Sequence, residues 1–523
     1  MKKYLLLVIC SGFTCASIAQ QKVTLPNGWS LTPAGTSLRL GDLPLNIAVS
    51  ASQRLMAVTN NGQGKQSLQL IDVKKETVID NISIQRAWLG LKFSRDEKFL
   101  YVGAGNDNQI LKYAVKDGKL VLQDSIVLGK KWPNKISPAG LDIDDDRDLM
   151  YVVTKDNNSV YVVDLKSKET VKKVPINGEG YTCLLSPDKK ELYVSCWGCD
   201  KLVIFNTSDM KMLHEIPVGD NPNELCLTKD GSRLFVANAN DNSVSVINVQ
   251  QRKVTETLSA SLYPNDPPGS TTNGLALSAD EHSLFIANAD NNSLAVFDVS
   301  NPGESSSRGF IPVGWYPTCV RVVKKKIFVT NGKGFSSFPN PKGPSPVKRA
   351  VKHQAEDDDG PQYIGGLMKG TMSIINIPSD EKLDEYSKQV YLNSPYNKEL
   401  NAINKMPGDN PIPQGPADVS PIKHVFYIIK ENRTYDQVLG DVKGGNGDTS
   451  LLLFGEKYTP NLHKLVKDFV LLDNFYVDGE VSADGHNWSM GAYATDYLEK
   501  NWVTSYGGRG GEYDAEGTRG GAN

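Results

Sequence analysis

Short apolar runs recur at nearly constant spacing along the first 394 residues of the chain. Each run has the length and turn-bounded pattern of a β-strand. The runs begin at Leu55, Leu100, Met150, Leu192, Leu234, Leu284 and Ile327. Successive starts are 45, 50, 42, 42, 50 and 43 residues apart. This period is typical of a four-stranded propeller blade, so the pattern predicts an all-β, seven-bladed propeller over residues 41–394.

Turn residues keep the same register as the apolar runs. In four repeats a serine or threonine precedes the run by six residues, and an aspartate follows it two positions later. The pairs are Ser94 with Asp96, Ser186 with Asp188, Thr228 with Asp230, and Ser278 with Asp280. Such side chains favour turns because they bond to nearby backbone groups. The fixed offsets therefore support a true repeat.

Residues Leu234–Ile247 and Leu284–Phe297 resemble the YVTN-type bacterial β-propeller repeat, and the resemblance covers roughly residues 41–394. The seventh repeat carries a long insertion around Gly332–Gly370, and long insertions often occupy a binding face. A propeller fold does not fix a function. The propeller could bind a substrate, a protein or a glycan, or it could support a second domain, and the sequence does not choose between these roles.

A different pattern follows a linker rich in Asn and Pro at residues 395–420. The apolar run Val425–Ile429 predicts a buried strand, which leads directly into Glu431, Asn432 and the sequence Arg-Thr-Tyr-Asp. Side chains at the carboxyl end of a buried strand lie where open α/β sheets place their ligands. An acid and an amide there indicate a metal site, with a solvated turn as the alternative.

The stretch from His424 to Asp436 resembles the opening of the phosphoesterase family that includes bacterial acid phosphatases and phospholipases C, within the alkaline phosphatase superfamily. The resemblance implies that Glu431 and Asn432 bind a catalytic divalent metal ion. Zn, Ca, Mg and Mn all remain open as its identity. The implied substrate is a phosphate ester, and the implied domain is α/β over residues 421–523.

A second stretch, Thr459-Pro460-Asn461-Leu462 with the alternating run Phe469–Tyr476, resembles the segment of sulfatases and phosphodiesterases of the same superfamily that leads through a helix and a strand to the nucleophile. The resemblance implies Ser482 as the nucleophile and His486 as a second catalytic residue. A serine hydroxyl is a weak nucleophile and needs a metal or a base beside it. The alternatives are a loop serine and a loop or core histidine, and Thr434 and Ser489 are further nucleophile candidates.

Only 37 residues follow His486. Relatives in the superfamily complete the metal site from the far half of the domain. We therefore expect an incomplete, alkaline phosphatase-like α/β domain and weak or no catalysis by this chain.

Composition and termini narrow the setting. A formal charge of −3 and a pI near 6.1 leave no electrostatic footprint for nucleic acid. Residues 1–19 have the charged start, apolar run and small residues of a signal peptide, and we expect a periplasmic or extracellular protein. No apolar run is long enough to span a membrane. The pair Cys196 and Cys199 predicts a structural turn, with or without a local disulfide.

The sequence thus predicts an exported, metal-dependent phosphoesterase that hydrolyses a phosphate mono- or diester through Ser482, with an N-terminal propeller for binding or scaffolding. The alternative is an extracytoplasmic propeller binding protein without catalytic activity. A propeller lactonase or dehydrogenase is a third hypothesis, and no cofactor ligand set in the sequence supports it.

Overall fold

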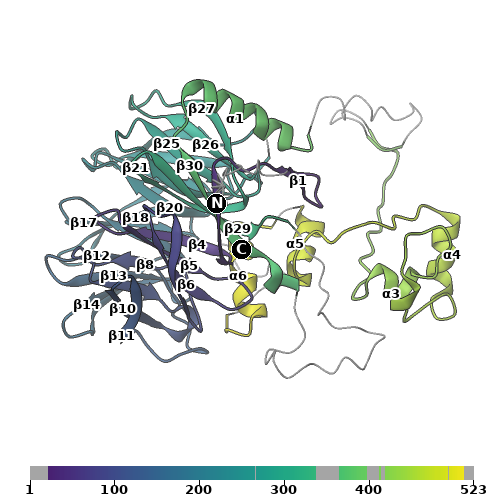
Figure 1. The fold of residues 1–523 in the computed structure, drawn as a ribbon, viewed down its shortest axis with the longest axis horizontal. Helices are drawn as coiled ribbons and strands as arrows, with labels where there is room; N and C mark the ends of the chain where they lie inside the picture. The colour runs from purple at the N-terminus through teal and green to yellow at the C-terminus, as the bar shows by residue number, and fades with distance from the viewer. Residues whose placement is uncertain are drawn as a thin grey trace, which may run out of the picture.

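Seven four-stranded antiparallel sheets are arranged around a common axis (Figure 1). The computed structural model describes residues 22–264, 267–336, 364–396, 411–413, 419–492 and 494–511. The predicted signal peptide, the centre of the insertion and most of the predicted linker lie outside these ranges. The prediction of a seven-bladed propeller is confirmed.

Each blade contributes four strands, numbered from the channel outward. Blade one consists of β4 to β7 (Pro44–Val49, Leu55–Asn60, Ser67–Asp72, Thr77–Ser83), blade two of β8 to β11 (Leu91–Phe93, Phe99–Gly103, Gln109–Lys116, Lys119–Val127) and blade three of β12 to β15 (Pro138–Asp144, Leu149–Thr154, Ser159–Asp164, Thr170–Pro175). Blade four consists of β16 to β19 (Gly180–Leu185, Glu191–Cys196, Lys201–Asn206, Met212–Pro217), blade five of β20 to β23 (Pro222–Leu227, Arg233–Asn238, Ser243–Asn248, Lys253–Ser259) and blade six of β24 to β27 (Thr272–Leu277, Ser283–Asn288, Ser293–Asp298, Ser306–Pro312). Blade seven consists of β28, β29, β30 and β3 (Trp315–Val323, Lys326–Gly334, Lys369–Asn376, Thr36–Asp42).

The seven apolar runs form the second strand of each blade. These strands are buried on both faces because neighbouring blades pack against them, which explains why the runs are almost wholly apolar. The predicted turns also form. The Ser94 hydroxyl donates to Asp96 over 2.7 Å, and Ser186 donates to Asp188 over the same distance. In both turns the aspartate also accepts the backbone N–H two residues later, which fixes the hairpin between the first two strands.

Blade seven is completed by the N-terminal part of the chain. Strand β3 pairs with β30 in antiparallel register, with Leu38 opposite Met372. Three strands of blade seven therefore come from the end of the propeller sequence and one from its start. The pairing of β3 with β30 closes the ring of blades. The closing strand begins at Thr36, five residues before the boundary that the repeat suggested.

Helices surround or follow the ring. Helix α1 (Asp380–Asn393) packs on β27, and α3 (Tyr435–Leu439) and α4 (Pro460–Asp468) lie in a lobe away from the propeller (Figure 1). Helices α5 (Ser482–Gly491) and α6 (Asp496–Tyr506) lie against the ring. The short elements are β1 (Val23–Thr24), β2 (Ser30–Leu31) and the 3-10 turns η1 (Gly105–Asp107), η2 (Ile364–Leu367) and η3 (Thr449–Leu451). No helix among the described residues is long and apolar enough to cross a membrane.

The predicted strands of the second domain do not form. In the described part of the chain no strand follows β30, and Val425, Phe426 and Ile428 are 81, 91 and 83% exposed. The run Phe469–Tyr476 is likewise without strand structure. An extended apolar segment becomes a strand only when a neighbour takes its backbone hydrogen bonds, and these runs have none in the described residues. The helix expected after Thr459 does form as α4, with Pro460 at its first position. An alkaline phosphatase-like α/β domain is therefore not shown.

Closure of blade seven predicts a strong dependence on β3. Leu40→Ala, at a side chain only 6% exposed, should lower the free energy of unfolding by about 2–4 kcal/mol. Leu122→Ala on β11, where the side chain is 56% exposed, should change it by less than about 0.5 kcal/mol. Equilibrium denaturation in urea measures both, and equal effects would contradict the closing role of β3.

Candidate functional site

Two of the predicted site residues, far apart in sequence, meet in the structure. His486 Nε2 lies 3.4 Å from Glu431 Oε1, although 55 residues separate them. Ser482 is the exposed first residue of α5, and His486 follows one turn later, so both lie on the same side of this helix. Asn432 is exposed beside Glu431, and its carbonyl accepts from Arg433. No hydrogen bond from Ser482 to Glu431 or His486 occurs among the described residues.

The further nucleophile candidates have structural positions. Thr434 is the N-cap residue of α3. The Ser489 hydroxyl donates to the backbone carbonyl of His486 over 3.3 Å, so it is engaged within α5. His424 precedes the exposed apolar run and is itself exposed. The predicted site therefore centres on α5 and the Glu431 motif.

Helix α6 enters the mouth of the central channel. Its Lys500 is 1% exposed and lies 2.7 Å from Asp496 Oδ1, one turn earlier on the same helix. Lys500 also donates to the Tyr181 hydroxyl over 3.0 Å and to Asn273 Oδ1 over 2.7 Å. Asn223 Nδ2 donates to Asp496 Oδ2 over 3.3 Å. These propeller side chains come from the innermost strands of blades four, five and six.

Apolar side chains of α6 fill the rest of the mouth. Trp502 and Val503 are buried in one cluster with residues of six blades. The propeller members of this cluster are Leu43, Leu45, Trp88, Leu89, Ala139, Tyr181, Trp197, Ala289 and Tyr316. Aromatic rings also meet here, with Trp197 5.1 Å from Tyr181 and 5.0 Å from Tyr497 between ring centroids. The helix thus closes this end of the channel.

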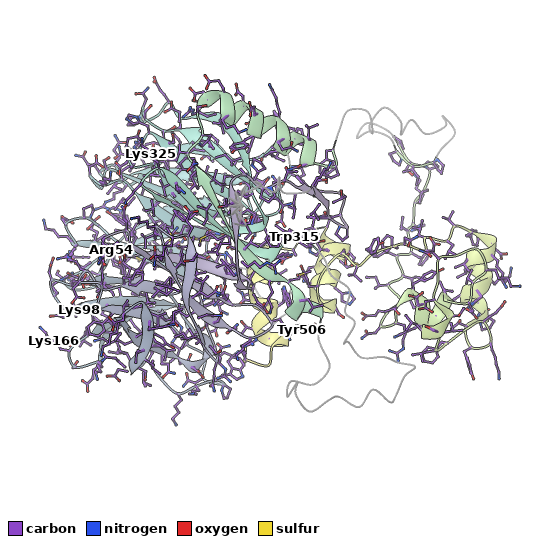
Figure 2. The ribbon with its side chains drawn as sticks, in the orientation of Figure 1. Arg54, Lys98, Lys166, Trp315, Lys325 and Tyr506 are labelled. Atoms are coloured by element: carbon purple, nitrogen blue, oxygen red, sulfur yellow. A yellow bond between two sulfur atoms is a disulfide. The ribbon has the colours of Figure 1, made fainter. Side chains whose placement is uncertain are left out.

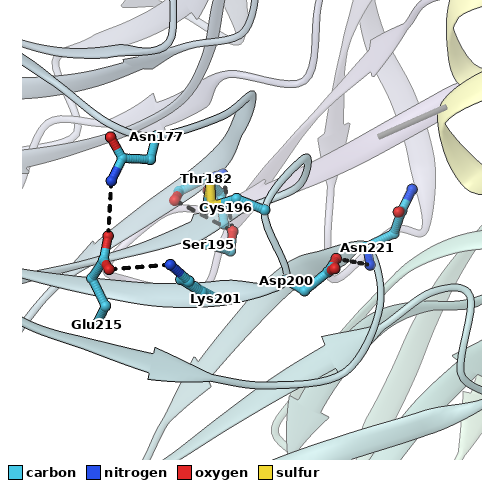
Figure 3. The surroundings of a disulfide bond; sticks show 9 residues. Asn177, Thr182, Ser195, Cys196, Asp200, Lys201, Glu215 and Asn221 are labelled. Atoms are coloured by element: carbon cyan, nitrogen blue, oxygen red, sulfur yellow. Dashed lines mark hydrogen bonds and ion pairs between the residues drawn. A yellow bond between two sulfur atoms is a disulfide. The ribbon is translucent and has the colours of Figure 1, made fainter. Parts of the chain in front are cut away.

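A disulfide holds the turn that carries Trp197. Cys196 ends β17 and is bonded to Cys199, which confirms the predicted structural turn (Figure 3). Trp197 lies within this turn and is fully buried against α6. The pair therefore has a packing role at the channel mouth.

An acidic cluster joins α5 and α6 to blade seven. Carboxylate oxygens of Glu480, Asp484 and Glu499 lie within 4.8 Å of one another. Lys333 on β29 approaches Glu480 at 2.7 Å and Glu499 at 3.2 Å. Burial raises the pKa of Glu499 well above its ordinary value, against the attraction of Lys333. Burial by itself would lower the pKa of Lys333. The attraction of Glu480 and Glu499 is stronger than this effect, so the pKa of Lys333 is raised above its ordinary value.

A large cleft opens beside this cluster. Its volume is about 1820 Å³, and Trp29, Trp315 and Trp488 lie among its aromatic walls. Asp290, Lys333, Glu480 and Glu499 form its polar end. Figure 2 shows Trp315 of the ring and Tyr506, the last residue of α6, on the same side of the molecule. Burial raises the pKa of Asp290 to about 6, although Thr271 donates a hydrogen bond to its carboxylate.

The sequence did not reveal the residues that anchor α6. Asp496 and Lys500 are four residues apart and follow the N-cap Thr495, a pattern that ordinarily indicates an ion pair on an exposed helix face. Only the apolar Trp502 and Val503 after them hint at burial. The partners Tyr181, Asn223 and Asn273 lie hundreds of residues away, so no local signal connects them.

Comparison with known proteins supports the propeller alone. The family described as "Lactonase, 7-bladed beta-propeller" matches residues 183–325, which lie in blades four to seven. No curated protein matches the chain. Among solved structures, hydrazine synthase of Kuenenia stuttgartiensis is similar at 17% identity with a TM-score of 0.46, covering 55% of this chain and 92% of that chain.

The raised pKa of Asp290 predicts that ionisation of this carboxyl lowers the stability of the folded protein. The folded protein holds this proton more tightly than the unfolded chain, so stability falls as pH rises from about 4 to about 6 and stays lowered above that. Asp290→Asn should raise the midpoint of thermal unfolding by on the order of 2 °C near pH 8 and leave it unchanged near pH 3.

Asp280→Asn is the matched control. The Ser278 hydroxyl holds the pKa of Asp280 below its ordinary value, so this substitution should lower the midpoint near pH 8. Thermal scans at both pH values measure the two variants. A loss at pH 8 for Asp290→Asn would contradict the burial penalty.

Proposed function

We propose that this chain carries active-site residues of an exported, metal-dependent phosphoesterase, held on a propeller scaffold. The contact between Glu431 and His486 is the main support. It joins the two motifs that suggested this chemistry in the sequence, one before and one after the residues that form α3 and α4.

The spacing of the two side chains suits a shared cation. Ligand atoms at about 2.0–2.2 Å from a tetrahedral ion lie roughly 3.4 Å apart. The separation of Glu431 Oε1 and His486 Nε2 is 3.4 Å. Carboxylate and imidazole are donors that zinc accepts, whereas the amide oxygen of the adjacent Asn432, proposed as a further ligand, is a donor that Ca²⁺ and Mg²⁺ favour. The distance between Glu431 and His486 therefore supports the proposal of a shared metal ion, for which His486 would be a ligand in addition to Glu431 and Asn432.

Ser482 would act as the nucleophile from the same helix. A cation bound here would offset charge on the phosphoryl oxygens and favour the ionised hydroxyl. The chain's own contribution is placement, because Ser482 and His486 share one side of α5. An exposed serine at a helix start also leaves room for an ester substrate to approach.

The propeller would hold α5 in place. Glu480 directly precedes the pair Val481 and Ser482 and is bound to Lys333 of blade seven. Helix α6 follows α5 and is anchored in the channel mouth. Both ends of α5 are thus attached to the ring.

The catalytic proposal predicts a large loss of turnover from single substitutions. Glu431→Gln and Ser482→Ala should each lower kcat/KM for metal-dependent hydrolysis of an aryl phosphate by at least about a hundredfold, because one removes a charge at the metal and the other the nucleophile. The assay compares each variant with the unmodified 523-residue chain.

Exposed residues of the same lobe provide the controls. Glu456→Gln and Ser450→Ala should leave turnover unchanged, since Glu456 is exposed and pairs with Lys467 of α4, and Ser450 is an exposed residue of η3. Undiminished hydrolysis in Glu431→Gln or Ser482→Ala would refute the proposed roles.

Metal binding gives a separate test that needs no substrate. Glu431→Gln and His486→Ala should each weaken Zn²⁺ binding by at least about tenfold in equilibrium dialysis. His282→Ala, at an exposed histidine of a propeller turn, should bind like the unmodified chain. Equal Zn²⁺ binding by all variants would show that these residues do not share a cation.

The cleft supports a second candidate, an extracytoplasmic binding protein without catalysis. Aromatic walls beside a polar end are common in ligand sites. Under this hypothesis Trp315→Ala abolishes ligand capture and Glu431→Gln leaves it intact. The first proposal predicts that Glu431→Gln removes turnover, so the two are distinguishable.

A further inference from the structure

The channel mouth has the properties of a docking site for a separate helix. Residues 480–509 contact every blade of the ring. The propeller residues involved are Gln63 in blade one, Asn106 in blade two, Lys155 in blade three, Tyr181 in blade four, Asn223 in blade five, Asn273 in blade six and Lys333 in blade seven. A surface that meets all seven blades belongs to the assembled ring and to no single blade.

The centre of this surface is polar and desolvated. Lys500 is surrounded by Asp496, Tyr181 and Asn273, and burial lowers its pKa against the attraction of Asp496. A buried charge without its partners is strongly unfavourable, so this position accepts α6 only in one orientation. The buried aromatic side chains packed around it, such as Trp197 and Trp502, are of the type that carries most of the energy of protein interfaces.

Around Lys500 the segment makes two kinds of contact with the ring, apolar packing by α6 and hydrogen bonds by Arg509. Trp502 and Val503 pack against rings and aliphatic chains of the inner strands. Arg509 donates to the carbonyls of Gln63 and Gly64, and Asn106 donates to the carbonyl of Arg509. The buried apolar packing of Trp502 and Val503, with hydrogen bonds of Arg509 at the periphery, matches the apolar core and polar rim of a specific interface.

We propose that residues 478–511 are a docking segment for the propeller's channel mouth, and that the two parts remain associated after the chain between them is cut. The propeller then holds α5 through a non-covalent interface and not through the connecting chain. The proposal does not depend on the chemistry proposed for Ser482.

The test uses the full chain with a protease site introduced at residues 401–406. After cleavage, the two pieces should co-elute in size-exclusion chromatography at micromolar concentration, and dilution gives their dissociation constant. Lys500→Met and Trp502→Ala should each raise that constant at least tenfold. The double variant Asp496→Leu with Lys500→Met should bind more tightly than Lys500→Met alone, because it leaves no unpaired buried charge.

Helix α4 supplies a matched control for the ion pair. Lys464 and Asp468 are also four residues apart, and both are exposed. Lys464→Met should therefore leave the dissociation constant unchanged. The thermal transition of the ring, followed by circular dichroism in each variant, separates loss of docking from loss of fold.

Three results would overturn the proposal. These are separation of the unmodified pieces at micromolar concentration, equal dissociation constants for Lys500→Met and Lys464→Met, or no difference between the double variant and Lys500→Met. None of these measurements uses hydrolysis, so the outcome is independent of the phosphoesterase proposal.

Discussion

The Lys500 ammonium in the channel mouth is the interaction on which the C-terminal arrangement depends. Removing a charge from water is costly, and here the cost is offset by Asp496 on the same helix and by polar groups of two blades. Such a pair contributes more to specificity than to stability. It restricts the orientation in which α6 can occupy this position.

The position of α6 in the ring determines which concave surface of the propeller is exposed. One end of the central channel is filled by Trp502, Val503 and their neighbours, so the exposed concave surface lies instead at the cleft beside α5. The cleft has walls from the ring and from residues 474–480, and its polar end contains Lys333 and the acidic cluster. The propeller thereby contributes to a joint surface with the segment that carries Ser482 and His486.

The lobe with α3 and α4 has a different character. Its apolar runs Val425–Ile429 and Phe469–Tyr476 are exposed, whereas the propeller strands of similar composition are buried between blades. The propeller strands have adjacent strands and covering blades that stabilise β-structure, and the two exposed runs have no such neighbours among the described residues. Exposed apolar surface of this extent is characteristic of an interaction surface.

The ring of seven blades could be predicted from the sequence because its pattern repeats. Seven runs in one register predicted seven blades, and Ser/Thr–Asp turns marked four of the hairpins, because the blades share the same packing arrangement and a similar local pattern. The start of α4 and the Cys196–Cys199 turn were likewise predictable from local sequence. Tertiary structure alone decided that β3 closes blade seven, that Lys500 is buried and that Glu431 meets His486. These contacts join residues far apart in the chain, and a local pattern of polar and apolar residues does not encode which distant group will lie opposite.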